Sequence, residues 1–278
     1  MKKTINIKGE LLDLSTPVVM GILNITPDSF YEGSRKQNEV DILKRVEEII
    51  LQGGTIVDIG AQSTRPTSQF LSSEEEIERL SPALSAINRE FPSVILSIDT
   101  FHADVAKLCV QDFGVAIVND ISGGNLDVNM FQTVADLQVP YILMHMRGTP
   151  QTMQKLNNYD DLIQNIAYYF SEKVAHLHRL GVNDIILDPG FGFSKDVFQN
   201  YELMRHLNFF ENFELPLLVG ISRKSMITRF LEVAPSEALN GTTVLNTYAL
   251  MNGANILRVH DVKEACEAIK ITEQLRYK

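Results

Sequence analysis

The stretch Ile185-Ile186-Leu187-Asp188 is a short apolar run that ends at a carboxylate, and it decides the fold because the chain carries eight such runs. Apolar runs of this length, separated by helical stretches, are typical of parallel β-strands buried on both faces. The runs, each with the polar residues that follow it, are Val18 to Leu23 (Asn24), Thr55 to Ile59 (Thr64 and Arg65), Val94 to Ile98 (Asp99), Ala116 to Val118 (Asn119), Tyr141 to Met144 (His145), Ile185 to Leu187 (Asp188), Leu217 to Ile221 (Ser222 and Lys224) and Ile256 to Val259 (His260). This order predicts a (β/α)8 TIM barrel whose active site lies at the carboxyl ends of the strands.

Helical periodicity fills the intervals between the runs. Val40, Leu43, Val46 and Ile50 recur at helical spacing, and Ser73 is the expected N-cap of the next helix. The eight expected helices cover residues 40–51, 73–91, 102–112, 128–137, 159–180, 198–207, 237–251 and 262–275. Residues 1–15 are expected to form a short hairpin that closes the N-terminal mouth. We therefore expect a single barrel domain over residues 1–278.

Composition excludes several classes of protein. The formal charge of the 278-residue chain is −10, which argues against a nucleic-acid surface. No apolar stretch approaches a membrane span or a signal peptide, and the two cysteines, Cys109 and Cys266, lie in helical patterns where a disulfide is not expected. We expect a cytoplasmic protein, with local cations for any anionic substrate at Arg65, Lys224, Arg258 and His260.

Three polar strand ends suggest a pocket for a flat, nitrogen-rich heterocycle. Asp99 and Asp188 follow strongly apolar runs, where an unpaired carboxylate is costly, so each should have a partner. Carboxylates accept paired N–H donors, and the amide of Asn119 both donates and accepts. The alternatives are a structural ion pair for the two carboxylates and an N-cap role for Asn119.

Two further segments suggest a ligand and a phosphate site. Asp188-Pro189-Gly190-Phe191-Gly192-Phe193 has more glycine and aromatic content than a simple turn requires; Phe191 is expected in the core and Phe193 beside a ligand. Ser222-Arg223-Lys224-Ser225 leads from the seventh strand into a helix, where barrels commonly bind phosphate, although such a run is also an ordinary helix start.

The eighth run contributes Arg258 and His260, which alternate around Val259 and so point to the same side. Asn24, on the neighbouring first strand, is expected beside them. These residues suit a diphosphate with Mg2+, which prefers oxygen ligands and retains water. A structural hydrogen bond is the alternative for His260. The pair His176 and His178 diverges on a helix, so no function is expected of it.

With these residues in place, the chain resembles the dihydropteroate synthases, the pterin-binding TIM-barrel enzymes of folate biosynthesis. The similarity extends from Met20 to Val262 and rests on six segments in order: Met20-Gly21-Ile22-Leu23-Asn24-Ile25-Thr26-Pro27-Asp28-Ser29-Phe30, Ser63-Thr64-Arg65-Pro66, Met144-His145-Met146, the segments that begin at Asp188 and Ser222 quoted above, and Arg258-Val259-His260-Asp261.

The resemblance implies a transferase that condenses 6-hydroxymethyl-7,8-dihydropterin diphosphate with 4-aminobenzoate. It also implies inhibition by sulfonamides, which imitate 4-aminobenzoate. It implies the following sites: pterin binding by Asp99, Asn119, Asp188 and Lys224; aminobenzoate binding by Thr64, Arg65, Phe193, Ser222 and Lys224; diphosphate binding by Asn24, Arg65, Arg258 and His260, with Asn24 on Mg2+. Asp99, Asp188, Lys224, Arg258 and His260 are the expected catalytic residues.

The resemblance also implies a homodimer and two loops, Thr26 to Lys36 and Ser63 to Ser73, that close over the site. Dimer contacts are expected on barrel helices remote from the mouth, where Leu245, Tyr248, Ala249 and Met251 offer apolar surface. Two rival functions remain: a methyltetrahydrofolate corrinoid methyltransferase, which shares the pterin edge, and a non-enzymatic pterin-binding paralogue.

Overall fold

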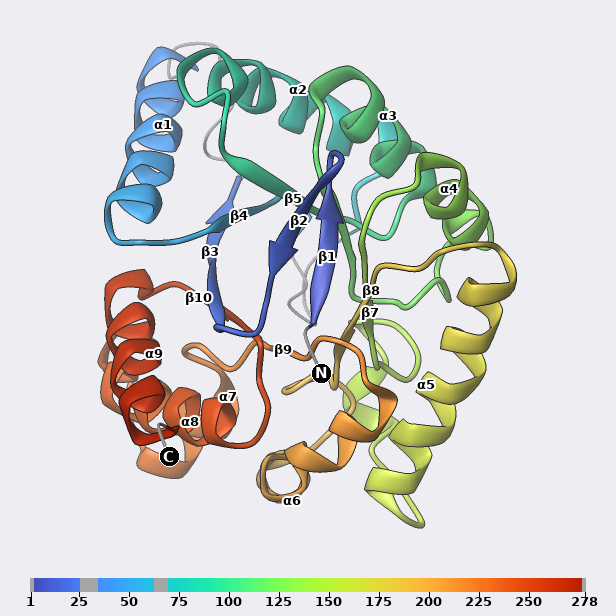
Figure 1. Ribbon diagram of the computed structural model, residues 1–278, viewed down its shortest axis with the longest axis vertical. Helices are drawn as coiled ribbons and strands as arrows, with labels where there is room; N and C mark the ends of the chain where they lie inside the picture. The colour runs from blue at the N-terminus through green and yellow to red at the C-terminus, as the bar shows by residue number, and fades with distance from the viewer. Residues whose placement is uncertain (1–2, 26–34, 63–69, 277–278) are drawn as a thin grey trace.

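The chain forms a ring of parallel strands surrounded by helices in a computed structural model that describes residues 3–25, 35–62 and 70–276 (Figure 1). The barrel strands are β3 (Val18–Asn24), β4 (Ile56–Gly60), β5 (Ile95–Asp99), β6 (Ile117–Asp120), β7 (Tyr141–Met144), β8 (Ile185–Asp188), β9 (Leu218–Val219) and β10 (Ile256–Val259). Their order is β8-β7-β6-β5-β4-β3-β10-β9, and a backbone bridge between Leu187 and Leu217 closes the ring. The predicted (β/α)8 barrel is confirmed.

Nine α-helices lie in the described part of the chain and form the outer layer. They are α1 (Arg35–Leu51), α2 (Ser73–Glu90), α3 (Ala103–Phe113), α4 (Met130–Leu137), α5 (Leu162–Arg179), α6 (Val197–Arg205), α7 (Ser225–Leu231), α8 (Leu239–Met251) and α9 (Val262–Arg276). Short 3-10 helices occur at Met153–Lys155, Leu207–Phe213 and Pro235–Glu237. None of the described helices is long and apolar enough to cross a membrane.

One local expectation from the sequence was wrong. The N-cap of α2 is Ser72, not Ser73: its hydroxyl accepts from Glu75 N at 3.2 Å, and the Glu75 carboxylate accepts from Ser72 N at 2.8 Å. This reciprocal capping box satisfies two backbone donors, which the adjacent serine does not do here. Helix α7 follows the Ser222-Arg223-Lys224 turn, where the sequence indicated that a helix begins, and it is separate from α8.

The predicted N-terminal hairpin is confirmed. Strands β1 (Thr4–Ile7) and β2 (Glu10–Asp13) pair antiparallel, and Figure 1 shows them across the opening of the ring. Ile5, Ile7 and Leu14 are buried against the inward-facing apolar residues of the strands. This contact closes the end of the barrel opposite the carboxyl ends of its strands.

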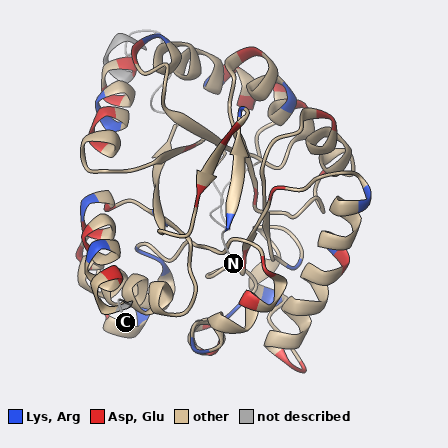
Figure 2. Ribbon diagram, viewed as in Figure 1, with Lys and Arg blue, Asp and Glu red and all other residues tan. Residues whose placement is uncertain are grey.

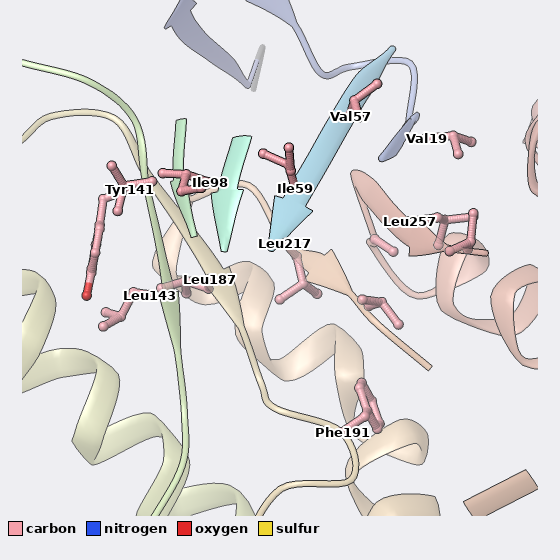
Figure 3. Close-up of a cluster of buried hydrophobic side chains, with 14 of the residues drawn as sticks. Val19, Val57, Ile59, Ile98, Tyr141, Leu143, Leu187, Phe191, Leu217 and Leu257 are labelled. Atoms are coloured by element: carbon pink, nitrogen blue, oxygen red, sulfur yellow. The ribbon is translucent and has the colours of Figure 1, made fainter. Parts of the chain in front are cut away.

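The main apolar core lies between the strands and the helices. Figure 3 shows its strand residues, among them Val19, Val57, Tyr141 and Leu257, all buried. Alternate residues of the same strands, such as Met20 and Ile56, face the barrel interior and belong to a second cluster. Figure 2 shows that most of the charged residues lie on the outer helices and loops, whereas a barrel strand has at most one.

The cysteines and the predicted dimer surface were also located. Cys109 and Cys266 are both free thiols, as expected. On α8, Tyr248 and Met251 are exposed, but Ala249 is fully buried and Leu245 packs against the core. Only part of the apolar surface expected on this helix therefore faces outward.

Candidate active site

A layer of polar side chains fills the barrel interior directly above an apolar layer. Residues two positions apart on a strand point the same way. Four polar residues each follow an inward-facing isoleucine by two positions: Asp58 after Ile56, Asn119 after Ile117, Asp188 after Ile186 and Arg258 after Ile256. Asp99 pairs in register with Asn119 on the neighbouring strand. Five strands therefore direct polar groups into one space at the carboxyl end of the barrel.

Arg258 links two of the carboxylates in this space. Its Nε donates to Asp58 Oδ2 and its Nη2 donates to Asp99 Oδ2, both at 2.6 Å. Asn119 Nδ2 donates to the same Asp58 oxygen at 3.0 Å. Asp58 is fully buried, yet its Oδ1 has no hydrogen-bond partner among the described residues. Because an unsatisfied buried acceptor is costly, a ligand that brings N–H groups is favoured here.

Burial governs the ionisation of these groups. It raises the pKa of Asp99 to about 7, although the positive charge of Arg258 opposes the shift. Burial also raises the pKa of Asp188, with Lys224 as the main opposing charge. Conversely, burial lowers the pKa of Lys224 to about 8, and Asp188 partly restores it. Two carboxylates with raised pKa values beside two cations can hold either a neutral or a positively charged heterocycle.

Lys224 joins this polar layer to the turn after β8. Its Nζ donates to the carbonyl of Phe191 at 2.5 Å and lies 4.7 Å from the ring centre of Phe193. Asp188 Oδ1 accepts from Gly190 N at 2.8 Å within the same turn. Phe191 is fully buried, as the sequence predicted, and Phe193 presents its ring to the ammonium.

Ser222 and His260 form a second group beside the first. The Ser222 hydroxyl lies 3.1 Å from His260 Nδ1 and accepts from His260 N at 3.2 Å. Burial lowers the pKa of His260 to about 4, and Arg223 and Arg258 add to the shift. Near pH 7 the imidazole is therefore neutral and can offer a hydrogen bond but not a charge. Arg223 is paired with Asp261.

Some predicted site residues are not joined to these groups. Thr64 and Arg65, and most of the two predicted closing loops, lie outside the described residues. Asn24 ends β3 with its side chain exposed at the mouth of the barrel. No cluster of three or more His, Cys, Asp or Glu side chains suited to a metal occurs in residues 3–25, 35–62 and 70–276. The role of Asn24 on Mg2+ stays a prediction.

Two alternatives raised by the sequence can now be answered, and one residue was missed. Asn119 is not an N-cap, because α4 begins after Asn129 and the Asn119 side chain bonds Asp58 inside the barrel. Asp99 does form an ion pair, with Arg258.

The sequence analysis did not identify Asp58, because this residue lies within an apolar run. The cost of burying a carboxylate in a strand was the signal that could have identified it.

Comparison with known proteins decides the family. A family model described as pterin binding enzyme matches residues 20–260. The dihydropteroate synthase of Escherichia coli K12 is 43% identical over 96% of this chain and 94% of its own length, and that of Synechocystis is 42% identical over 92% and 89%. The chain belongs to the dihydropteroate synthase family. It is thus a transferase, as the six motifs indicated.

Solved dihydropteroate synthases share the whole architecture. A Yersinia pestis dihydropteroate synthase in a sulfonamide complex is 41% identical, with a TM-score of 0.91 over 98% of this chain and 99% of that one. A Xanthomonas albilineans dihydropteroate synthase with 4-aminobenzoic acid is 30% identical, also with a TM-score of 0.91, over 100% of both chains. The match extends from the hairpin to α9, so the strands of this chain correspond to those of a dihydropteroate synthase barrel.

The dihydropteroate synthase motif with Thr64 and Arg65 is flanked by ordered contacts. Gln62 Oε1 accepts from Leu71 N at 2.8 Å, which brings the two ends of the segment together. His102 Nε2 lies 3.2 Å from the carbonyl of Leu71. These contacts place Gln62, Leu71 and His102 next to one another.

Proposed function

We propose that this protein condenses 6-hydroxymethyl-7,8-dihydropterin diphosphate with 4-aminobenzoate to give 7,8-dihydropteroate and diphosphate. The observation that carries the proposal is the set of buried acceptors formed by Asp58, Asp99, Asn119 and Asp188, beside the cations Arg258 and Lys224. A pterin edge supplies the N–H donors that these acceptors need. The matching barrel of relatives solved with 4-aminobenzoate or sulfonamide supports the second substrate.

The individual roles are part of the proposal. Asp99, Asn119, Asp188 and Lys224 bind the pterin; Thr64, Arg65, Phe193, Ser222 and Lys224 bind aminobenzoate; Asn24, Arg65, Arg258 and His260 bind diphosphate. The ring of Phe193 beneath Lys224 supports a stacked arylamine with its carboxylate near a cation. Sulfonamides, as aminobenzoate mimics, would compete at the same place.

The chemistry needs no nucleophilic side chain, because an arylamine is neutral and nucleophilic near pH 7. The difficult step is the loss of diphosphate, so we propose that the C–O bond breaks first and diphosphate leaves with the bonding electrons. Asp99 and Asp188 stabilise the pterin cation, while Arg258 and neutral His260 donate hydrogen bonds to the departing oxygens. The amine nitrogen then attacks the methylene carbon and loses its proton. Ser222 holds the imidazole in place.

Asn24 suits Mg2+ on chemical grounds. Its amide supplies an oxygen ligand and its side chain is exposed at the mouth. Mg2+ retains several waters and takes few protein ligands when phosphate is present, so a single side chain is sufficient. When bound, the ion would neutralise charge on the diphosphate.

Positional oxygen exchange tests the dissociative step. Pterin diphosphate labelled with 18O at the bridging position is incubated with enzyme and Mg2+ in the absence of aminobenzoate. Scrambling of the label into the non-bridging positions is expected if the C–O bond breaks and re-forms. Turnover with aminobenzoate but no scrambling would favour direct displacement.

A test of the leaving group separates the rival functions. The proposed synthase uses the pterin diphosphate and not the free 6-hydroxymethyl alcohol. A corrinoid methyltransferase would instead consume methyltetrahydrofolate with a corrinoid acceptor. A pterin-binding paralogue would bind and convert neither.

We further propose that the protein is a cytoplasmic homodimer. The exposed apolar residues Val244, Tyr248 and Met251 lie on one face of α8 and support a contact there.

A further inference from the structure

Lys195 is a fully enclosed lysine whose ammonium bonds three acceptors from two loops. It follows the β8 turn, and its side chain is only 3% exposed. Its Nζ lies 3.0 Å from the carbonyl oxygens of Gly190 and Phe193, and 3.1 Å from Nδ1 of His145 at the end of β7. A lysine ammonium has three N–H donors, so each finds an acceptor.

The turn that Lys195 spans approaches β7 very closely. Gly190 has φ +72°, and a Cβ at this position would lie 2.1 Å from the carbonyl oxygen of His145. Only glycine permits this approach. The ammonium is thus placed where it can bond the turn and the end of β7 at once.

The two carbonyls that Lys195 bonds, those of Gly190 and Phe193, lie on either side of Phe191 in the sequence. Between them, the carbonyl of Phe191 accepts from Lys224, and the ring of Phe193 lies under the same ammonium. A change in the turn at Phe193 therefore moves the ring and the acceptor of Lys224 together. Asp188 is one step further away, because it accepts from the N–H of Gly190 whereas Lys195 bonds the carbonyl of Gly190.

Desolvation opposes the burial of the Lys195 ammonium, so stability of the fold alone does not account for a lysine at this position. Burial lowers its pKa to about 7, with the charge of Asp188 as the main opposing effect. Burial also holds the pKa of His145 well below its usual range. Apolar residues usually fill such a position at least as stably as a buried charge.

We propose that Lys195 is a positioning residue that shapes the aminobenzoate side of the pocket by fixing Phe193 and the Phe191 acceptor of Lys224. The inference rests on the proposed function. Lys195 touches the pterin side only indirectly, through Gly190, so we expect pterin binding to change much less than aminobenzoate binding. A variant of Lys195 should therefore weaken the binding of 4-aminobenzoate much more than the binding of pterin diphosphate.

Lys195→Met tests this, with Lys173→Met as the matched control. Lys173 also bonds loop acceptors at the barrel mouth, Gly123 O and Asn125 Oδ1, but these belong to the loop after β6. In Lys195→Met the KM for 4-aminobenzoate should rise about tenfold or more. The kcat and the Kd for pterin diphosphate should stay within about threefold, and the control should change none of them.

A residue that only stabilised the fold would lower the melting temperature and the active fraction, and leave the KM of the surviving enzyme unchanged. An unchanged KM in folded Lys195→Met, or equal loss for both substrates, overturns the proposal. If the methionine variant does not fold, Lys195→Gln decides by the same criteria, since its amide retains a donor for one carbonyl.

Failure of the proposed function is recognised separately. If wild-type protein makes no dihydropteroate, the Kd of 4-aminobenzoate in the presence of pterin and diphosphate replaces KM in the comparison. A wild-type protein that binds no aminobenzoate contradicts the function itself, whereas binding that Lys195→Met leaves unchanged contradicts the positioning role alone.

Discussion

Asp58 holds two of the other polar residues in the barrel interior. It accepts from both Arg258 and Asn119, and it is fully buried. Asp99 completes the group from the other side of the guanidinium. The position of Arg258 is therefore set by two carboxylates before any substrate binds.

Asp58→Ala should lower the free energy of unfolding by about 2 to 4 kcal/mol, because it leaves Nε of Arg258 and Nδ2 of Asn119 without their acceptor. Glu267→Ala is the control: it removes the partner of Lys263 in an exposed pair at 3.9 Å and should cost less than about 0.5 kcal/mol. Urea denaturation measures both. Equal losses would contradict the central place given to Asp58.

Asp188→Ala should weaken the binding of pterin diphosphate by about 2 to 4 kcal/mol, because a charge-assisted acceptor is lost. Asp184→Ala is a control at the other end of β8, where the carboxylate accepts from Asn6 N at 3.2 Å near the hairpin. Calorimetry should detect the loss only in the first variant. An unchanged dissociation constant for Asp188→Ala would refute the assignment.

Residues that end apolar runs could be found from the sequence, and the residue hidden inside one could not. Asp99, Asn119 and Asp188 were identified because each ends a run, whereas Asp58 is flanked by Val57 and Ile59. The sequence also could not show which side chains bond each other, since Asp58 and Arg258 are 200 positions apart. The hydrogen bonds of Lys195 needed the folded turn for the same reason.

At the scale of elements, long periodic segments were predictable and short ones were not. The seventh strand was expected over Leu217 to Ile221, but pairing stops at Val219, because the chain then turns through Arg223 with φ +58°. Helix α7 has seven residues, too few for a periodic pattern to show. The barrel was still evident, since the other strands and helices were found close to their observed bounds.

Helix α2 is tied to β5 by a buried acid, which gives an element-level prediction. Glu76 accepts from Thr100 Oγ1 at 3.1 Å, its Oε1 has no hydrogen-bond partner among the described residues, and burial raises its pKa from 4.5 to about 8. The folded state thus holds a proton that the unfolded chain releases between these values. The contribution of Glu76 to stability therefore falls as pH rises through this window.

Glu76→Gln removes this pH dependence. The free energy of unfolding of the variant, relative to that of wild type, should therefore increase by on the order of 3 kcal/mol from pH 5 to pH 9. Urea unfolding at the two pH values measures the change. Glu78→Gln, on the exposed face of the same helix, should show none. A difference between Glu76→Gln and wild type that does not vary with pH would show that Glu76 is ionised throughout.

At the scale of the whole molecule, the hairpin closes one end of the barrel and leaves the polar layer at the other. This separation allows outer helices to associate without disturbing the site. On α8, Val244 is 59% exposed and Tyr248 42% exposed, which leaves apolar area uncovered in a single chain.

Sedimentation velocity should show a dimer for the wild-type protein and a shift to monomer for Val244→Asp, because a charge on this face disrupts an apolar contact. Val128→Asp, at a 90% exposed apolar position ahead of α4, should leave the dimer intact. A monomeric wild-type protein, or a dimer unaffected by Val244→Asp, would exclude α8 as the contact.

The most direct measurement of the central claim is product stoichiometry. Purified protein is incubated with pterin diphosphate, 4-aminobenzoate and Mg2+, and dihydropteroate is followed by mass spectrometry together with diphosphate release. We expect one dihydropteroate for each diphosphate, over many turnovers. Tight pterin binding with neither product would contradict the claim and identify the barrel as a pterin-binding protein without synthase activity.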